Sequence, residues 1–86
     1  MKRVQRVQTG VRIEERTLKV LKALAAYLDL SLGDLIEGIV LHVFEGKTPF
    51  SRETVRQIAQ LKAVYGLDLN AADAHRLREE PDHDSH

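Results

Sequence analysis

The sequence predicts a mainly α-helical fold with one β-strand at its N-terminus. Residues 4–13 alternate apolar or threonine side chains with polar ones, which is typical of a strand that has one buried face. Three later segments repeat apolar residues at helical spacing, and residues that favour helix ends stand beside them. We therefore expect the chain to begin as a strand and to continue as helices.

Length and composition indicate one small cysteine-free domain. A chain of 86 residues buries only about 60% of the surface that its unfolded form exposes, so its own core is modest. With no cysteine, disulfide frameworks and thiolate metal sites are excluded. No apolar run approaches the roughly 18 residues of a membrane span, and the basic N-terminus lacks the apolar region of a signal peptide. We expect a soluble cytoplasmic protein without a membrane partner.

The charged residues are distributed unevenly along the chain. The net charge is zero, yet residues 1–22 carry seven Lys or Arg against two Glu, a balance of +5, so the remaining 64 residues sum to −5. The basic end coincides with the predicted strand. This asymmetry indicates either contact with nucleic acid or a solvated basic arm.

Two helices are predicted directly after the strand. The first covers about residues 15–28, with acidic residues in its first turn, where the helix dipole favours them. The second begins after Ser31, which forms a capping-box-like start with Asp34, and Gly46 is placed to end it. Together with the strand, these helices define residues 1–46 as the predicted core of the domain.

A helical C-terminal extension is predicted over residues 47–78. Ser51 and Gly66 are placed to cap a helix over about residues 52–65, and Asn70 begins a short helix through about Leu77. Residues 79–86 contain no apolar side chain apart from a proline, and we expect this acidic tail to be disordered.

The predicted strand needs a partner, because unpaired backbone N–H and C=O groups are costly away from water. No other stretch of the sequence is a convincing second strand. The simplest partner is the same strand of a second molecule, paired antiparallel about a two-fold axis. We expect a homodimer with a two-stranded ribbon, in which Val7, Thr9, Val11 and Ile13 face the helices.

A strand with a basic outer face, followed by two helices and a serine cap on the second, resembles the ribbon-helix-helix family of DNA-binding proteins. The resemblance covers roughly residues 4–45. It implies an intertwined dimer that lays its ribbon in the DNA major groove. The matching base-contacting positions are Gln8, Gly10 and Arg12, of which Gln suits adenine and Arg suits guanine. Gly10 departs from the family, which normally has a polar side chain there.

The resemblance also implies phosphate contacts at the N-terminus of the second helix, through the backbone of Ser31, Leu32 and Gly33. The alternative is that Ser31 is an ordinary cap without a ligand. Asp29 departs from the Gly or Asn usual in the family and puts a carboxylate beside this site. Further phosphate contacts are expected from a mobile basic arm. They involve Lys2, Arg3 and Arg6, while Arg16, Lys19 and Lys22 either add to them or form a solvated helix face.

The function implied by this resemblance is sequence-specific binding of double-stranded DNA by a nucleoid-associated transcriptional regulator, either a repressor or an antitoxin that controls its own operon. Two such dimers could assemble into a tetramer on DNA. The alternative is a dimeric protein-interaction module, or an antitoxin whose main role is to bind a partner protein such as a toxin through residues 47–78. The residues expected in the dimer core are Val11, Ile13, Leu21, Leu24, Ile36, Ile39 and Val40.

The sequence offers little material for catalysis. It has no glycine-rich phosphate loop and no Ser/His/Asp arrangement, and His42 stands between apolar neighbours. His83 and His86 form only a weak metal-ligand pattern with the neighbouring Asp82 and Asp84. We expect no catalytic residue, no metal and no cofactor, and therefore not an enzyme.

Overall fold

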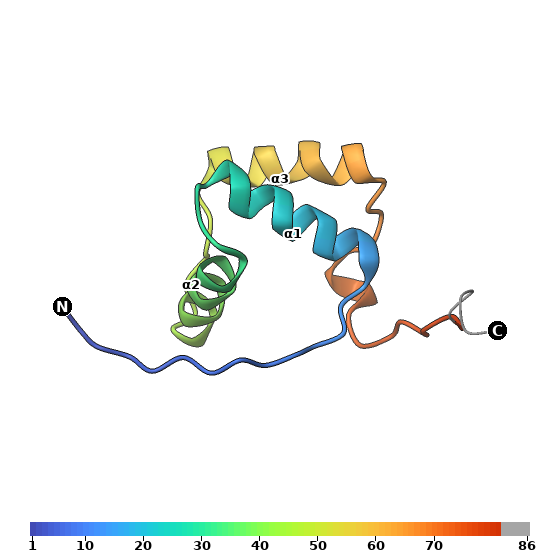
Figure 1. Cartoon of the computed structure of the whole chain (residues 1–86). Helices are drawn as coiled ribbons and strands as arrows, with labels where there is room; N and C mark the ends of the chain where they lie inside the picture. The colour runs from blue at the N-terminus through green and yellow to red at the C-terminus, as the bar shows by residue number, and fades with distance from the viewer. Residues whose placement is uncertain (82–86) are drawn as a thin grey trace.

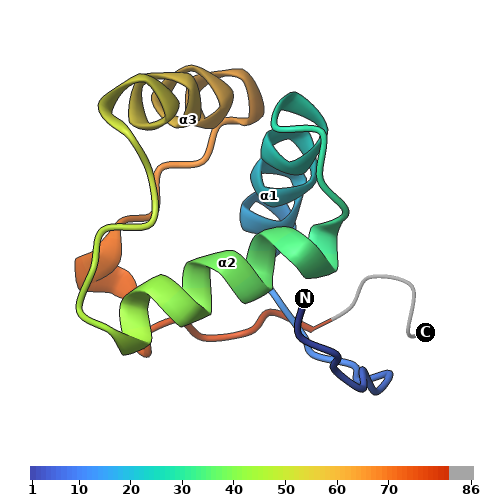
Figure 2. The ribbon, with the colours of Figure 1, turned by 90° about the vertical axis from the view of Figure 1, so that its left-hand side faces the viewer.

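The computed structural model describes residues 1–81 and is built from three α-helices. They are α1 (Glu15–Tyr27), α2 (Leu32–Phe44) and α3 (Arg52–Tyr65), and a 3-10 turn, η1, follows at Ala71–Asp73. Helix α1 packs against both α3 and α2, as Figures 1 and 2 show from two sides. Within the described part of the chain, no helix has the length and apolarity that a membrane crossing requires.

The three long helices are confirmed, and local caps explain their bounds. The Ser31 hydroxyl accepts a hydrogen bond from the backbone N–H of Asp34 at 3.1 Å, and Ser51 accepts one from that of Thr54 at 3.2 Å. Helix α3 ends at Tyr65 and is capped by Gly66, whose φ of 65° lies in the left-handed region that glycine tolerates best. These caps satisfy backbone groups that have no partner inside the helix.

The expected fourth helix is reduced to the single turn η1. Asn70 and Asp73 form the reciprocal capping box that starts it. The chain then leaves helical geometry, because Ala74 has a ψ of 137° and His75 has a φ of 67°. The prediction that this helix continues to Leu77 is therefore wrong.

The predicted N-terminal strand is also wrong, and with it the two-stranded ribbon. Residues 1–14 run as an extended segment outside the helices, and residues 1–81 contain no β-strand. Alternating side chains favour an extended backbone, but a strand exists only where a second extended segment pairs with it. The described chain supplies none, because its other long segments are helical. Val11, expected to face the helices, is 73% exposed.

The core of the single chain is small and centres on α1. Its buried apolar side chains are Val20, Leu24, Ala25 and Leu35. Partly buried residues pack around this centre, among them Phe50, Ile58 and Leu61 from the third-helix region. Thus α3 helps to cover the face of α1 that the sequence assigns to the core.

The seven residues expected in a dimer core have different environments in the single chain. Leu24 is buried, while Leu21, Ile36 and Ile39 are half-buried. Val11, Ile13 and Val40 are exposed. Val11 and Ile13 were expected in the dimer core only because they belonged to the predicted ribbon. Since the described residues form no ribbon, this expectation is wrong. Burial of Val40 between two chains stays a prediction.

Candidate nucleic-acid interface

The most basic feature of the molecule is the N-terminal arm, which we define as residues 1–13. It carries four Lys or Arg and no Asp or Glu, and every one of its residues is exposed. The arm leads into Glu14, the N-cap of α1, and passes α2 on its way outward (Figure 1). The sequence therefore places its concentrated positive charge on a segment with little packing of its own.

Arg6 ties the arm to α2 through two acidic residues. Its Nε and Nη2 atoms each donate a hydrogen bond of 3.0 Å to the carboxylate of Glu37. Nη2 also lies 3.8 Å from Oδ1 of Asp34. Hydrogen bonding to Arg6 lowers the pKa of the Glu37 carboxyl below its usual value. This two-pronged geometry is the one that a guanidinium also uses with phosphate.

The other end of the arm meets the C-terminal segment. Arg12 forms an ion pair with Glu79, and both side chains remain largely exposed. Gln8 and Gly10, the other two base-contacting candidates, are exposed as well, and a Cβ at Gly10 would meet nothing within 4 Å. The three residues thus lie on one accessible segment, but Arg12 already has an acidic neighbour.

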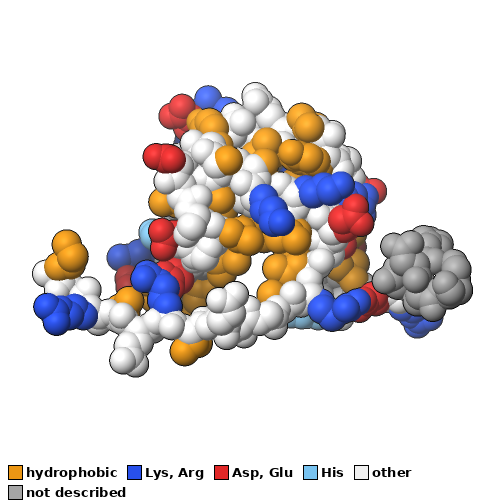
Figure 3. Space-filling view, in the orientation of Figure 1, with side chains coloured by type: hydrophobic (Ala, Val, Ile, Leu, Met, Phe, Trp, Pro, Cys, Tyr) orange, Lys and Arg blue, Asp and Glu red, His pale blue; other side chains and the backbone are white. Residues whose placement is uncertain are grey.

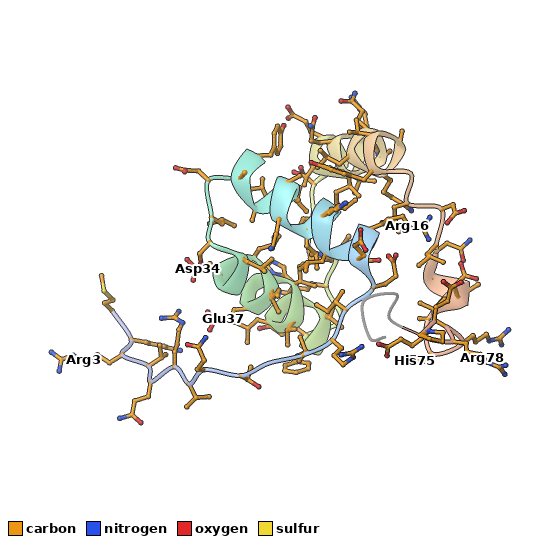
Figure 4. The ribbon with its side chains drawn as sticks, turned by 45° about the vertical axis from the view of Figure 1, so that its right-hand side comes forward. Arg3, Arg16, Asp34, Glu37, His75 and Arg78 are labelled. Atoms are coloured by element: carbon orange, nitrogen blue, oxygen red, sulfur yellow. The ribbon has the colours of Figure 1, made fainter. Side chains whose placement is uncertain are left out.

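Lys2 and Arg3, the outermost cations of the arm, differ from Arg6 and Arg12 in their contacts. Figure 4 shows Arg3 projecting from the outer end of the arm, while Asp34 and Glu37 lie on α2 beside the arm. Neither Lys2 nor Arg3 forms an ion pair with any residue in the range 1–81. Within the arm, these two residues are therefore the cations that have no acidic partner in the described structure.

The N-terminus of α2 combines the predicted phosphate contacts with acidic residues that oppose an anion. Ser31 uses its hydroxyl to cap the helix, and Leu32 and Gly33 follow in the first turn. Asp34 stands in that same turn and repels an anion. Asp29 adds a second carboxylate shortly before the helix and adopts a left-handed φ of 59°. The structure thus places the three predicted phosphate contacts together, with two acidic residues near them in the chain.

Arg16 holds the helices together. Its Nη1 atom donates hydrogen bonds to the carbonyl oxygen of Gly66 at 2.9 Å and to Asp68 at 3.1 Å. Its Nε atom donates to Glu14 at 3.1 Å. Lys19 pairs with Glu15 along the same helix. The sequence offered a phosphate contact or a solvated helix face for these cations, and the structure gives Arg16 a third role as a local structural contact.

Glu14 is a strong electrostatic cap at the junction of the arm and α1. Desolvation raises the pKa of its carboxyl, but four hydrogen bonds from Thr17 and Arg16 outweigh that effect and lower the pKa to about 2. The sequence indicates only a favourable interaction with the helix dipole. The bound carboxylate fixes the point where the arm leaves the helical core.

Apolar side chains form a second accessible surface. A groove of about 380 Å³ lies between α1, α3 and the segment after α3, with Val20, Ile58, Leu67 and Leu69 in its lining. Figure 3 shows hydrophobic side chains gathered in the middle of the visible face of the molecule. On α2, Leu41 and Phe44 are 60% and 79% exposed. These surfaces suit a protein partner better than a nucleic acid.

No family model, no curated protein and no solved structure matches this chain. The arm and the surfaces beside it are therefore the features from which a function can be inferred.

The histidines form no evident reactive centre in the described part of the chain. His42 lies exposed on α2, with its Nδ1 atom 2.6 Å from the carbonyl oxygen of Gly38. Residues 1–81 contain no group of three or more His, Cys, Asp or Glu side chains placed to hold a metal ion. The weak metal-ligand pattern that includes His83 and His86 falls outside the described residues.

The specific residues that pair with the arm could not be predicted from the sequence. Glu37 and Glu79 lie far from Arg6 and Arg12 along the chain, so no helical or strand spacing relates them. The only sequence signal is the opposite charge of the basic start and the acidic remainder. That signal predicts attraction between the two parts but does not select the pairs.

Proposed function

We propose that this protein binds double-stranded DNA through its N-terminal arm and regulates transcription. The observation that carries the proposal is the concentration of four positive charges, without any negative one, on a fully exposed extended segment. Such a segment can follow a phosphate backbone and release counterions from it. Lys2, Arg3 and Arg6 supply phosphate contacts, which position the protein without reading sequence.

Base recognition is proposed for the inner part of the arm. Arg12 donates to the O6 and N7 atoms of guanine, Gln8 pairs with adenine, and Gly10 lets the backbone approach the bases closely. The amides of Ser31, Leu32 and Gly33 add a phosphate contact, which Asp34 weakens. In this proposal the protein acts in the cytoplasm, associated with the nucleoid, as a repressor or as an antitoxin that controls its own operon.

We further propose that the protein works as a homodimer joined through α2. Its apolar residues Leu41, Val43 and Phe44 are exposed, and only four apolar side chains of the described residues are buried in the core. Covering this face with a second copy removes apolar surface from water, which is the main driving force for association. Sedimentation equilibrium should detect a dimer, and Phe44→Glu should shift it to the monomer. Pairs of dimers on DNA would make a tetramer.

Selection from random duplexes tests the DNA-binding proposal. At physiological ionic strength we expect the protein to enrich a sequence motif, and we expect Arg12→Ala to abolish the enrichment. Arg56→Ala removes the same charge from the exposed surface of α3 and serves as the matched control. Enrichment that is equal in all three proteins would contradict a base-reading role for Arg12, and no enrichment by a folded protein would contradict sequence-specific binding.

A protein-binding role is the second candidate, and the exposed apolar surface favours it. Val55 and Val64 on α3 are exposed, and the 380 Å³ groove lies beside the same helix. In this proposal residues 47–78 hold a partner protein such as a toxin. Saturable binding of a purified partner that is abolished in Val64→Asp, with the fold retained, would support it.

A further inference from the structure

We infer that the arm is held by the protein's own acidic residues in a latched state that competes with DNA. The latched state is defined by the ion pairs of Arg6 with Glu37 and of Arg12 with Glu79. The inference rests on the proposed function, because it concerns the same arm. It adds an autoinhibitory contact, which sets how readily the arm reaches a nucleic acid.

The two pairs hold the arm at separate points. Glu37 belongs to α2, whereas Glu79 belongs to the segment that follows η1. Asp34 adds a further negative charge beside Arg6. The inner arginines of the arm are therefore both paired, while the outer Lys2 and Arg3 form no ion pair in the described structure.

The carboxylates and DNA require the same donors. A guanidinium binds a carboxylate, a phosphate or a guanine edge through paired N–H groups. The Nε and Nη2 donors of Arg6 are both used by Glu37. Arg12 likewise cannot present the same N–H groups to guanine and to Glu79 at once. Binding of DNA through these same donors thus requires the ion pair of that arginine to open.

The strength of the pairs suits a reversible latch. All four side chains of the two pairs are substantially exposed, so water and salt screen their attraction. Exposed pairs of this kind shift an equilibrium by roughly two- to fivefold each. With a latch, the apparent affinity for DNA equals the intrinsic affinity multiplied by the fraction of molecules in which the arm is free. We therefore expect a modest inhibition that DNA overcomes.

Paired variants of the C-terminal segment test the latch. Glu79→Gln removes the ion pair with Arg12, and Glu80→Gln makes the same change of net charge at a residue that forms no ion pair with the arm in the described structure. At low salt, we expect Glu79→Gln to bind a 20-base-pair duplex about two- to fivefold more tightly than either the wild type or Glu80→Gln. The gain should shrink as salt rises, because salt already weakens the pair.

A double-mutant cycle separates the latch from long-range repulsion. In a chain that carries Arg12→Gln, the Glu79→Gln change should have no further effect on DNA binding, since the pair is already broken. An NMR measurement without DNA reports the pair directly. The signal of the Arg12 Nη2 group, which contacts Glu79, should shift in Glu79→Gln and stay unchanged in Glu80→Gln.

The outcomes distinguish the latch from the proposed function. Equal DNA affinities for Glu79→Gln and Glu80→Gln would overturn the latch while DNA binding itself stands. A gain that persists in the Arg12→Gln background would also overturn it, since the effect would not act through Arg12. If no variant binds the duplex, the proposed function fails and the inference fails with it. The Arg12 signal would then still show whether the ion pair exists.

Discussion

Arg16 at the start of α1 donates a hydrogen bond of 2.9 Å to the carbonyl oxygen of Gly66 at the end of α3. The same Nη1 atom reaches Asp68, and Nε reaches Glu14. A single guanidinium thereby joins two helices that lie far apart in the sequence. Its planar array of donors makes this arrangement possible, whereas a lysine ammonium would lack the same fork.

We predict that Arg16→Lys lowers the midpoint of thermal unfolding, even though it retains the charge. The reason is that lysine carries all its donors on one nitrogen, whereas Arg16 reaches Glu14 from Nε and both Gly66 and Asp68 from Nη1. Arg56→Lys, at an exposed position of α3, should leave the midpoint nearly unchanged. Circular dichroism melting of both variants checks the prediction. Equal midpoints for Arg16→Lys and the wild type would show that the contacts are dispensable.

Glu14 makes stability depend on pH in the acid range. Its pKa is about 2 in the folded protein, against 4.5 for the free group. Because the folded pKa is depressed, its contribution to stability is present above about pH 4.5 and is lost as the pH falls towards 2. Glu14→Gln should therefore flatten the decline of stability between pH 4.5 and 2. Denaturant unfolding at several pH values measures the difference. If the free energy of unfolding fell equally with pH in both proteins, Glu14 would not be a stabilising cap.

Asp29 occupies a backbone conformation better suited to glycine. Its φ is 59°, in the left-handed region, where a side chain generally costs energy. We predict that Asp29→Gly stabilises the protein by roughly 1 kcal/mol. Asp29→Ala keeps a Cβ at this φ, so it should not gain that stability. Urea unfolding compares the three proteins, and a less stable Asp29→Gly would mean that the aspartate side chain outweighs the strain.

Leu24 is the centre of the small core, with 2% of its surface exposed. Leu24→Ala should lower the free energy of unfolding by about 2–5 kcal/mol, because it removes apolar burial and leaves a cavity. Val64, at 74% exposure on α3, provides the contrast. Val64→Ala should change stability by less than about 0.5 kcal/mol. Similar decreases from both substitutions, measured by urea unfolding, would place the core elsewhere.

The sequence predicts the helices well because their signals are local. Ser31, Ser51 and Gly66 mark ends that the structure places within a residue or two of expectation. The strand failed because pairing requires a second extended segment, which local alternation cannot supply. Asp29 shows a related limit. Its departure from Gly or Asn is visible in the sequence, but its positive φ becomes evident only in the structure.

The candidate site was predictable only in part. The positive charge of the arm follows from its sequence, but its exposed position does not, because the alternation in residues 4–13 predicts a strand with one buried face. The contacts of Arg6 with Glu37 and of Arg12 with Glu79 depend on how the folded chain brings distant segments together. Attraction between a basic start and an acidic remainder was foreseeable, but its geometry was not.

The salt dependence of duplex binding tests the central claim that the arm binds DNA. We would measure the affinity for one duplex by fluorescence anisotropy from low to physiological salt, for the wild type and for a variant with Lys2→Gln and Arg3→Gln. These residues lie outside the latch, so replacing them leaves its ion pairs in place. We expect the variant to bind more weakly, with a log–log salt slope that is smaller by about 0.9 for each phosphate it no longer neutralises. Identical affinities and slopes for the two proteins would contradict DNA binding through the arm.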